Sequence, residues 1–449
     1  AYNRIAHLNR HQKECGVIAA SAGNHAQGVA FSAEKLGIKA LIVMPETTPG
    51  IKVEAVKRLG GEVVLFGENY SEAAEHAKKL QKESGMTFIH PFDDEFVIAG
   101  QGTVADEILR QRTGKLDAVF VPVGGGGLIA GMALYLKTLC PEIRVIGVEP
   151  EDSDAMYRSM KEGGRVMLEN VGIFADGVAV CQVGSLTYKL CEKYVDEIIR
   201  VSTDELCGGI KAVFQATRSV VEPAGGLAMA GLLKYVYERK PERETLVAVN
   251  SGANMNFERL RYVAERTLVG EQQEAIFGVT IPEEKGSLKR FCLDIVGHRN
   301  ITEFNYRLSS RDKAHIFVGI SIKSKAERKE FCELLTRSGY KNEDLTENEL
   351  AKTHVRYMVG GRSNLVKNER LFRFWFPEKP GALVNFLETT KGRSNISLFH
   401  YRMQGGDYGR VLVGLETVKG DEKALLKRLD KLGYRYEEET ENKAFAMFL

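Results

Sequence analysis

The chain has 449 residues, of which 44% are hydrophobic and 27% are charged, a composition typical of a globular protein with roughly two to four domains. Its formal net charge is +2, so charge gives no reason to expect nucleic acid or an anionic membrane as a partner. No stretch reaches the run of about 18 apolar residues that a transmembrane helix needs.

In the first third of the chain, short apolar runs alternate with helical stretches. The runs that we expect to be strands cover residues 16–20, 40–44, 62–66, 118–123 and 144–148. Near-continuous apolar strands separated by helices are typical of parallel sheets that are covered on both faces. The sequence therefore predicts an α/β fold with a mainly parallel sheet.

The next elements lead to the end of the first domain. Ser202-Thr-Asp-Glu205 matches a capping box and predicts a helix that runs towards Arg218. Leu246-Val-Ala-Val249 is expected to be one more buried strand. Further on, charged residues become denser and strand patterns alternate more. We therefore expect a linker near 265–274 and a first domain that covers residues 1–268.

The last part of the chain contains an internal repeat. Residues 281–291, 300–307 and 316–320 are similar to residues 376–386, 395–402 and 411–415, each pair with an offset of 95 residues. Each copy has the order strand, helix, strand, strand, helix, strand, which is the split-βαβ (ferredoxin-like) arrangement over roughly 70–80 residues. We expect two α+β repeats, at 275–346 and 370–449. Either a ligand binds in a crevice between the copies, or the duplication is purely structural.

A glycine-rich loop is the strongest local motif. Gly124-Gly-Gly-Gly-Leu128 follows an expected strand and opens a helix. Residues without Cβ let backbone N–H groups approach an anion, and the helix N-terminus adds its dipole. We interpret the loop as a phosphate site, because a tight turn would need fewer glycines. The pattern is not GxGxxG, but Glu149 lies near the position of a ribose-binding acid, so a dinucleotide is the alternative ligand.

Two further loops carry candidate site residues. Ser21-Ala-Gly-Asn-His-Ala-Gln-Gly28 also joins a strand to a helix, and its amides and the Ser21 hydroxyl could hold a carboxylate. Alternatively, Ser21 or Asn24 could simply cap the helix. Ser251 follows a buried strand, where open α/β sheets place ligands. Alone it would be a turn residue, but beside a phosphate loop it is a candidate partner for a cofactor ring.

Together these motifs resemble a known group of enzymes. The loops at 21–28, 124–127 and 250–256 resemble those of the pyridoxal-phosphate enzymes of the tryptophan-synthase-β type. Longer stretches narrow the resemblance to the threonine dehydratase family, namely Ile42–Pro45, Ile98–Thr103, Phe120–Leu128, Pro282–Gly286 and His354–Gly361. The resemblance covers essentially the whole chain. It implies two open, mainly parallel, three-layer α/β subdomains followed by two ACT-like α+β regulatory repeats.

The resemblance also implies a role for each candidate residue. The phosphate of pyridoxal phosphate would be held by Gly124, Gly125, Gly126, Gly127 and Leu128. Asn24 would bind the 3-oxygen of the ring, and Ser251 would meet the pyridine nitrogen. Ser21, Gly23 and His25 would lie in the loop that takes the substrate carboxylate. The substrate would be L-threonine, with L-serine as a second substrate, and threonine would give 2-oxobutanoate and ammonia.

The lysine that binds the cofactor in this family is expected outside the sequence. In the family it lies in a motif that ends Lys-x-Arg-Gly-Ala-Tyr, whereas this chain begins at Ala1-Tyr2, so the lysine would lie four residues before Ala1. No later lysine has the motif. We therefore expect the 449 residues to be part of a longer chain and not to turn over threonine by themselves. The alternative is a homologue without the lysine that acts as a regulatory, amino-acid-binding subunit.

For the tail, the resemblance implies inhibition by isoleucine, relief by valine, and a homotetramer. We expect the effector crevice between the copies because the repeated strands alternate polar and aromatic side chains, which leaves one face for a ligand. The expected lining residues are Asn395, Ile396, Leu398, Phe399 and Tyr401 with their counterparts Asn300, Phe304 and Tyr306.

The cysteines and histidines give no metal motif. The seven cysteines are scattered and odd in number, and none lies in a CxxC pair. This pattern argues against a disulfide framework and favours a reducing compartment, which would be the cytoplasm, or a plastid or mitochondrion in a eukaryote. His7 and His11 could share one helix face, but no third ligand follows nearby, so we interpret them as a surface pair.

Overall fold

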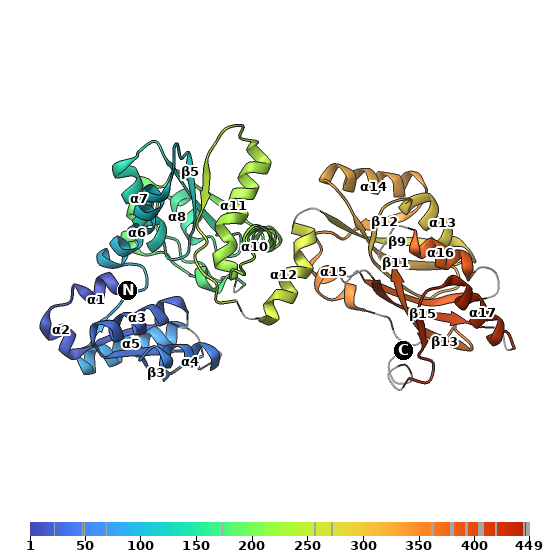
Figure 1. The fold of residues 1–449 in the computed structure, drawn as a ribbon, viewed down its shortest axis with the longest axis horizontal. Helices are drawn as coiled ribbons and strands as arrows, with labels where there is room; N and C mark the ends of the chain where they lie inside the picture. The colour runs from blue at the N-terminus through green and yellow to red at the C-terminus, as the bar shows by residue number, and fades with distance from the viewer. Residues whose placement is uncertain are drawn as a thin grey trace. The chain divides into compact units, whose positions relative to one another are not determined.

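The computed structural model describes residues 1–449 except 22, 47, 49, 69, 173, 256, 271–272, 359, 361–362, 378–380, 391–393, 403–407, 418–419, 443–444 and 446–449. Parts of several predicted segments lie outside the described residues, namely position 22 of the loop 21–28, position 256 of the loop 250–256, the linker at 271–272, positions 359 and 361 of the motif that ends at Gly361, and positions 378–380, 391–393, 403–407, 418–419, 443–444 and 446–449 of the second repeat. The chain forms two compact units, Ala1–Gly270 and Glu271–Leu449 (Figure 1).

The first half of unit 1 is a three-layer α/β subdomain. Its parallel sheet has the order β3-β2-β1-β4, with β1 (Val17–Ala20), β2 (Ala40–Met44), β3 (Glu62–Leu65) and β4 (Thr87–Phe88). The helices are α1 (Tyr2–Ala6), α2 (Arg10–Cys15), α3 (Asn24–Leu36), α4 (Gly50–Arg58) and α5 (Tyr70–Ser84). Alternate residues of β1 face opposite sides: Val17 packs with α3, whereas Ile18 packs with α5. The strand is therefore apolar throughout, as predicted.

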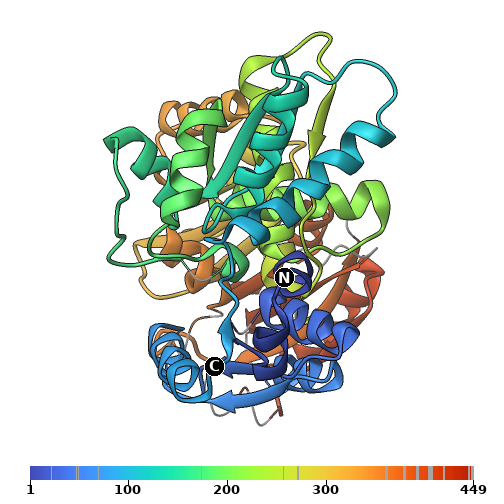
Figure 2. The same cartoon turned by 90° about the vertical axis from the view of Figure 1, so that its left-hand side faces the viewer.

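The second half of unit 1, coloured teal to yellow-green in Figures 1 and 2, has the same architecture. Its sheet has the order β7-β6-β5-β8. Its parallel strands are β5 (Ala118–Pro122), β6 (Arg144–Pro150), β7 (Glu197–Val201) and β8 (Leu246–Ala248). The helices are α6 (Glu95–Gln111), α7 (Gly127–Leu139), α8 (Ala155–Glu162), α9 (Ser185–Tyr194), α10 (Thr203–Thr217), α11 (Pro223–Arg239) and α12 (Phe257–Gly270), with a 3-10 turn η1 (Asp176–Val178). The predicted capping box is confirmed, because Ser202 and Glu205 bond reciprocally at the start of α10.

Unit 2 consists of the two repeats joined in one antiparallel sheet. The first repeat has β9 (Glu274–Pro282), α13 (Ser287–Arg290), η2 (Phe291–Val296), β10 (Ile301–Arg307), β11 (Lys313–Ser321), α14 (Lys325–Arg337) and β12 (Lys341–Asp344). The second has β13 (Glu369–Pro377), α16 (Ala382–Thr389), β14 (Asn395–Arg402), β15 (Tyr408–Glu416), α17 (Glu422–Leu432) and β16 (Tyr436–Glu438). The segment between them holds α15 (Glu349–Thr353) and η3 (Val355–Tyr357). The predicted element order is thus present in both copies.

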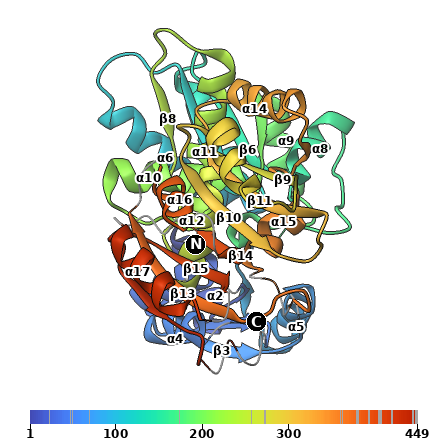
Figure 3. The ribbon, with the colours of Figure 1, turned by 90° about the vertical axis from the view of Figure 1, so that its right-hand side faces the viewer.

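The copies meet through β10 and β14, the central strands of the order β12-β9-β11-β10-β14-β15-β13-β16 (Figure 3). Phe304 pairs with Tyr401, and Tyr306 pairs with Phe399. Directly paired residues share a face, so these four rings lie on the side where the core of unit 2 packs against the helices. Within the described part of the chain, no helix is long and apolar enough to cross a membrane.

Candidate functional sites

The three predicted loops of unit 1 follow the carboxyl ends of parallel strands, as expected for ligand sites in open α/β sheets. The loop at Ser21 follows β1, the glycine loop follows β5, and the loop at Ser251 follows β8, which is paired with β5. Asn24 links the first and third loops. Its Nδ2 donates to Glu222 Oε1 at 2.9 Å, and its Oδ1 accepts a hydrogen bond from Asn254.

The glycine loop fits an anion such as a phosphate group. A Cβ on Gly125 would lie 2.2 Å from the Phe92 ring, and one on Gly124 would lie 2.9 Å from the Val178 backbone. Gly126 has φ +92° and would meet Met156 at 2.6 Å. Among the described residues, the N–H groups of Gly124, Gly125 and Gly126 have no acceptor. These donors lie directly before α7, so the loop has the geometry of a helix N-terminal anion site.

The alternative interpretations of the other motifs find less support. Gly23 is the N-cap residue of α3 and no side chain caps this helix, so neither Ser21 nor Asn24 does so. The Ser21 Oγ instead accepts from the Gly23 N–H at 3.2 Å. Glu149 is fully buried, and its carboxylate accepts the N–H groups of Met156 and Tyr157 at 2.9 and 2.7 Å. Burial raises the Glu149 pKa to about 8. This carboxyl group holds the start of α8, which leaves the dinucleotide alternative without its ribose ligand.

Ser251 and His25 complete the predicted cofactor and substrate set. Ser251 is exposed, and its Oγ lies 3.4 Å from the Ala224 carbonyl. His25 is mostly buried, with Nε2 3.0 Å from the Ile89 carbonyl oxygen, so that nitrogen carries the proton. Burial lowers the His25 pKa to about 4. The imidazole is therefore neutral at neutral pH, and the loop contributes hydrogen-bond donors rather than a positive charge.

Neutral His25 makes the stability of unit 1 depend on pH. The pKa is lowered in the folded state, so the unfolded chain takes up a proton first as the pH falls below 6.5. The contribution of neutral His25 to the free energy of unfolding is fully present above pH 6.5 and is lost progressively towards pH 4. We expect this loss to be about 2–3 kcal/mol larger in the wild type than in His25→Gln. Urea unfolding at neutral and mildly acidic pH measures it, and identical pH dependence in both proteins would contradict the assignment.

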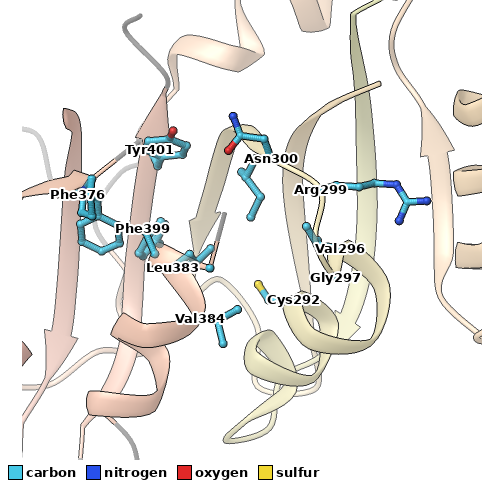
Figure 4. Close-up of a pocket in the computed structure, with 14 residues that line it drawn as sticks. Cys292, Val296, Gly297, Arg299, Asn300, Phe376, Leu383, Val384, Phe399 and Tyr401 are labelled. Carbon is cyan, nitrogen blue, oxygen red and sulfur yellow. The ribbon is translucent and has the colours of Figure 1, made fainter. Parts of the chain in front are cut away.

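Unit 2 contains a pocket between the two repeats (Figure 4). Its apolar walls come from η2 and α16 and include Val296, Leu383 and Val384. Of the predicted crevice residues, Asn300, Phe399 and Tyr401 line it. The Arg299 side chain points away from the cavity, towards Glu327 and the Phe331 ring.

The other predicted crevice residues do not line this pocket. Phe304 contacts the pocket residue Phe399, with its ring edge-on and 5.7 Å between the ring centroids. The Tyr306 hydroxyl donates to Glu283 Oε2 at 2.9 Å. Asn395 and Ile396 lie at the start of β14. Leu398 is paired with Arg307 and faces the other side of the sheet, because neighbouring strand residues alternate.

Comparison with known proteins identifies the family. Residues 1–252 match the model of the pyridoxal-phosphate dependent enzyme family. Residues 265–355 and 360–449 each match the C-terminal regulatory domain of threonine dehydratase. The chain belongs to the threonine dehydratase family.

Similarity to individual threonine dehydratases extends along the whole chain. The chain is 56% identical over 452 residues to the biosynthetic L-threonine dehydratase IlvA of Burkholderia multivorans, and the match spans 100% of this chain and 89% of that protein. The corresponding Escherichia coli protein is 52% identical over 451 residues, spanning 100% and 87%. The structure of threonine deaminase isoform 2 from Solanum lycopersicum has 48% identity and a TM-score of 0.58, covering 59% of this chain and 77% of that chain.

The family's cofactor is pyridoxal phosphate, and the structure adds residues near its candidate site that sequence reasoning missed. Glu222 and Asn254 form hydrogen bonds with the Asn24 side-chain amide, and Phe92 packs against the glycine loop. Thr187 donates to the Gly125 carbonyl. The sequence Glu222-Pro223 could have predicted the start of α11, because proline is favoured in the first turn of a helix. It does not indicate that the Glu222 carboxylate lies next to Asn24. In the pocket of unit 2, the missed residues include Cys292 and Val296 of η2, Leu383 and Val384 of α16, and Phe376 of β13.

Proposed function

We propose that unit 1 is the part of a threonine dehydratase that binds pyridoxal phosphate and L-threonine at the three loops, for the dehydration of threonine to 2-oxobutanoate and ammonia, the first step of isoleucine biosynthesis. The observation that carries the proposal is the row of N–H donors without acceptors among the described residues, at Gly124, Gly125 and Gly126 before α7. The relatives from Burkholderia multivorans and Escherichia coli are biosynthetic threonine dehydratases, which agrees with this chemistry.

Each loop has a separate task in the proposed site. Gly124–Leu128 hold the cofactor phosphate at the positive end of α7. Ser251 would offer the ring nitrogen a neutral hydroxyl rather than a carboxylate. Asn24, oriented by Glu222 and Asn254, binds the ring oxygen through its amide. When bound, the cofactor supplies an electron sink that makes the substrate Cα proton removable.

The substrate carboxylate is assigned to the loop of Ser21, Gly23 and His25. The loop precedes α3, whose N-terminal N–H groups favour an anion. His25 stays neutral and is fixed by the Ile89 carbonyl, so it shapes the loop without adding charge. L-Serine, which lacks one methyl group, is expected to bind in the same way, since the assigned contacts involve only the carboxylate and the cofactor.

The test combines cofactor binding with covalent trapping. Titration of the 449-residue polypeptide with pyridoxal phosphate, followed by fluorescence, is expected to show saturable binding. The absence of saturable binding would overturn the proposal.

Borohydride reduction is expected to attach no cofactor covalently to this polypeptide, because none of its lysines lies in the family motif. Lys52 is the control position: its Nζ lies 3.0 Å from Asp176, near Glu222. A labelled Lys52 would require the site to be reassigned.

We further propose that the pocket in unit 2 binds isoleucine as an inhibitor and valine as a competing effector. The apolar side chains of Val296, Leu383, Val384 and Phe399 suit a branched aliphatic group. Asn300 and Tyr401 add polar atoms to the lining, for the charged end of an amino acid. Because both repeats contribute to the lining, a ligand here would bias how the two copies pack against one another.

Filling the pocket should abolish effector binding. In Val384→Trp the larger side chain occupies the cavity, and we expect isoleucine affinity to fall at least about tenfold, which corresponds to about 1.4 kcal/mol. Isothermal titration with isoleucine measures the change. Leu350→Trp is the matched control, because Leu350 is exposed on α15 and does not line the pocket. Unchanged isoleucine binding in Val384→Trp, with a normal thermal transition, would place the effector elsewhere.

The assembly and compartment are also proposals. We propose a homotetramer that works in the cytoplasm, or in a plastid or mitochondrion in a eukaryote. The relatives include bacterial proteins and proteins named as chloroplastic and mitochondrial. Sedimentation equilibrium of the purified protein tests the oligomeric state, and a monomer at micromolar concentration would contradict it.

A further inference from the structure

The carbonyl group of Gly125 is fixed from the side of α9. Its oxygen accepts a hydrogen bond from Thr187 Oγ1 at 2.7 Å and a second from the Gly184 N–H at 3.3 Å. Thr187 is fully buried and lies in the first turn of α9. A Cβ on Gly126 would lie 2.9 Å from the Thr187 Cβ, so the loop and the threonine are in direct contact.

Fixing this oxygen also fixes a donor of the glycine loop. The peptide bond is planar and trans, so the C=O of Gly125 and the N–H of Gly126 point in opposite directions. With the oxygen directed to Thr187, the Gly126 N–H is directed away from α9. That N–H is one of the donors without an acceptor among the described residues. The threonine hydroxyl thus determines the direction of a proposed phosphate ligand without touching the phosphate itself.

The start of α9 is itself held by the segment that supports the glycine loop. Both carboxylate oxygens of Asp93 accept N–H groups from the first turn of α9, at Ser185 (2.9 Å), Leu186 (2.8 Å) and Thr187 (3.2 Å). The preceding residue, Phe92, packs against Gly125 and Gly127. Two neighbouring residues therefore hold both parts: Phe92 packs against the glycine loop, and Asp93 binds the helix turn that carries Thr187.

We propose that Thr187 is a positioning residue for the cofactor phosphate: through the Gly125 carbonyl it sets the Gly126 N–H in the direction that the phosphate needs. This inference rests on the proposed cofactor site. A hydroxyl that only satisfies a buried carbonyl would affect stability in general, whereas a positioning hydroxyl affects recognition of the phosphate in particular.

The test compares ligands with and without the phosphate in three proteins. Pyridoxine phosphate and pyridoxine are suitable probes, because neither forms a covalent bond with lysine. Thr187→Val keeps the shape of the side chain but removes the donor, and Thr187→Ser keeps the donor. We expect Thr187→Val to weaken pyridoxine phosphate about tenfold or more and to leave pyridoxine unchanged, while Thr187→Ser stays close to wild type. The phosphorus NMR signal of bound ligand should shift only in Thr187→Val.

Thr138→Val is the matched control, because the Thr138 hydroxyl also donates to a carbonyl, that of Leu134 at 2.7 Å, but is exposed on α7. Equal weakening of both ligands in Thr187→Val, or no weakening of either, would overturn the inference. A different result bears on the proposed function: if the wild type does not prefer pyridoxine phosphate to pyridoxine, the glycine loop is not a phosphate site.

Discussion

Gly126→Ala is expected to lower the affinity for pyridoxal phosphate about a hundredfold. At φ +92° an alanine is strained, and its Cβ would lie 2.6 Å from Met156 and 2.9 Å from Thr187. The left-handed conformation costs roughly 1–2 kcal/mol, and overpacking adds about 1–3 kcal/mol. The loop can relieve this strain only by turning its N–H groups away from the position they hold in the structure, so the loss should appear in cofactor binding.

Fluorescence titration measures this loss, and Gly164→Ala is its control. Gly164 has no atom within 4 Å of an added Cβ and no positive φ, so the same substitution there should leave binding unchanged. Wild-type affinity in Gly126→Ala would mean that the phosphate is held elsewhere. If the affinity fell because the whole protein had become less stable, the thermal unfolding of unit 2 would change as well. We expect the unfolding of unit 2 to stay the same.

Arg356→Met is expected to destabilise unit 2 by about 3–5 kcal/mol. The Arg356 guanidinium is buried in η3, 2.9 Å from Glu303 and 3.3 Å from Glu274, and both carboxylates are buried. Removing one partner of a buried ion pair leaves a charge without compensation, which is the costly case. The same arginine accepts, through its carbonyl, a hydrogen bond from Asn305 Nδ2 at 3.3 Å. Arg356 therefore fastens the segment between the repeats to the first repeat.

Urea unfolding monitored in unit 2 measures this effect. Arg435→Met is the control, because Arg435 pairs with Glu437 at 3.3 Å on the surface and its side chain is 72% exposed. An exposed pair of this kind contributes about 0–1 kcal/mol. Cofactor binding in unit 1 should be the same in all three proteins. If Arg356→Met and Arg435→Met unfold at the same urea concentration, the buried cluster contributes no more than a surface pair.

Local signals in the sequence explain why the fold could be predicted. The apolar runs and the capping box at Ser202 depend on neighbours in the chain, and the structure has each of them. The repeat offset of 95 also holds for the strands, since β9 starts at Glu274 and β13 at Glu369. The glycine loop could be recognised because its function requires a run of one residue type.

Contacts between distant residues explain what could not be predicted. Asp93 and Thr187 are 94 positions apart, and neither lies in a motif, so nothing in the sequence indicates that they fix the glycine loop. Glu222 reaches Asn24 across 198 positions. In the tail, composition alone could not separate Phe399 from Leu398: both are apolar and buried, but the alternation of the strand puts only Phe399 at the pocket.

The pairing of β10 with β14 has a consequence for how the regulatory signal depends on the amount of protein. The two copies that line the pocket belong to one polypeptide, so their local concentration is set by the connecting segment and not by the number of molecules in the cell. Dilution cannot separate the two walls. A regulatory site assembled from two separate chains would weaken whenever expression falls, whereas the proposed effector pocket is complete in every molecule as soon as it has folded.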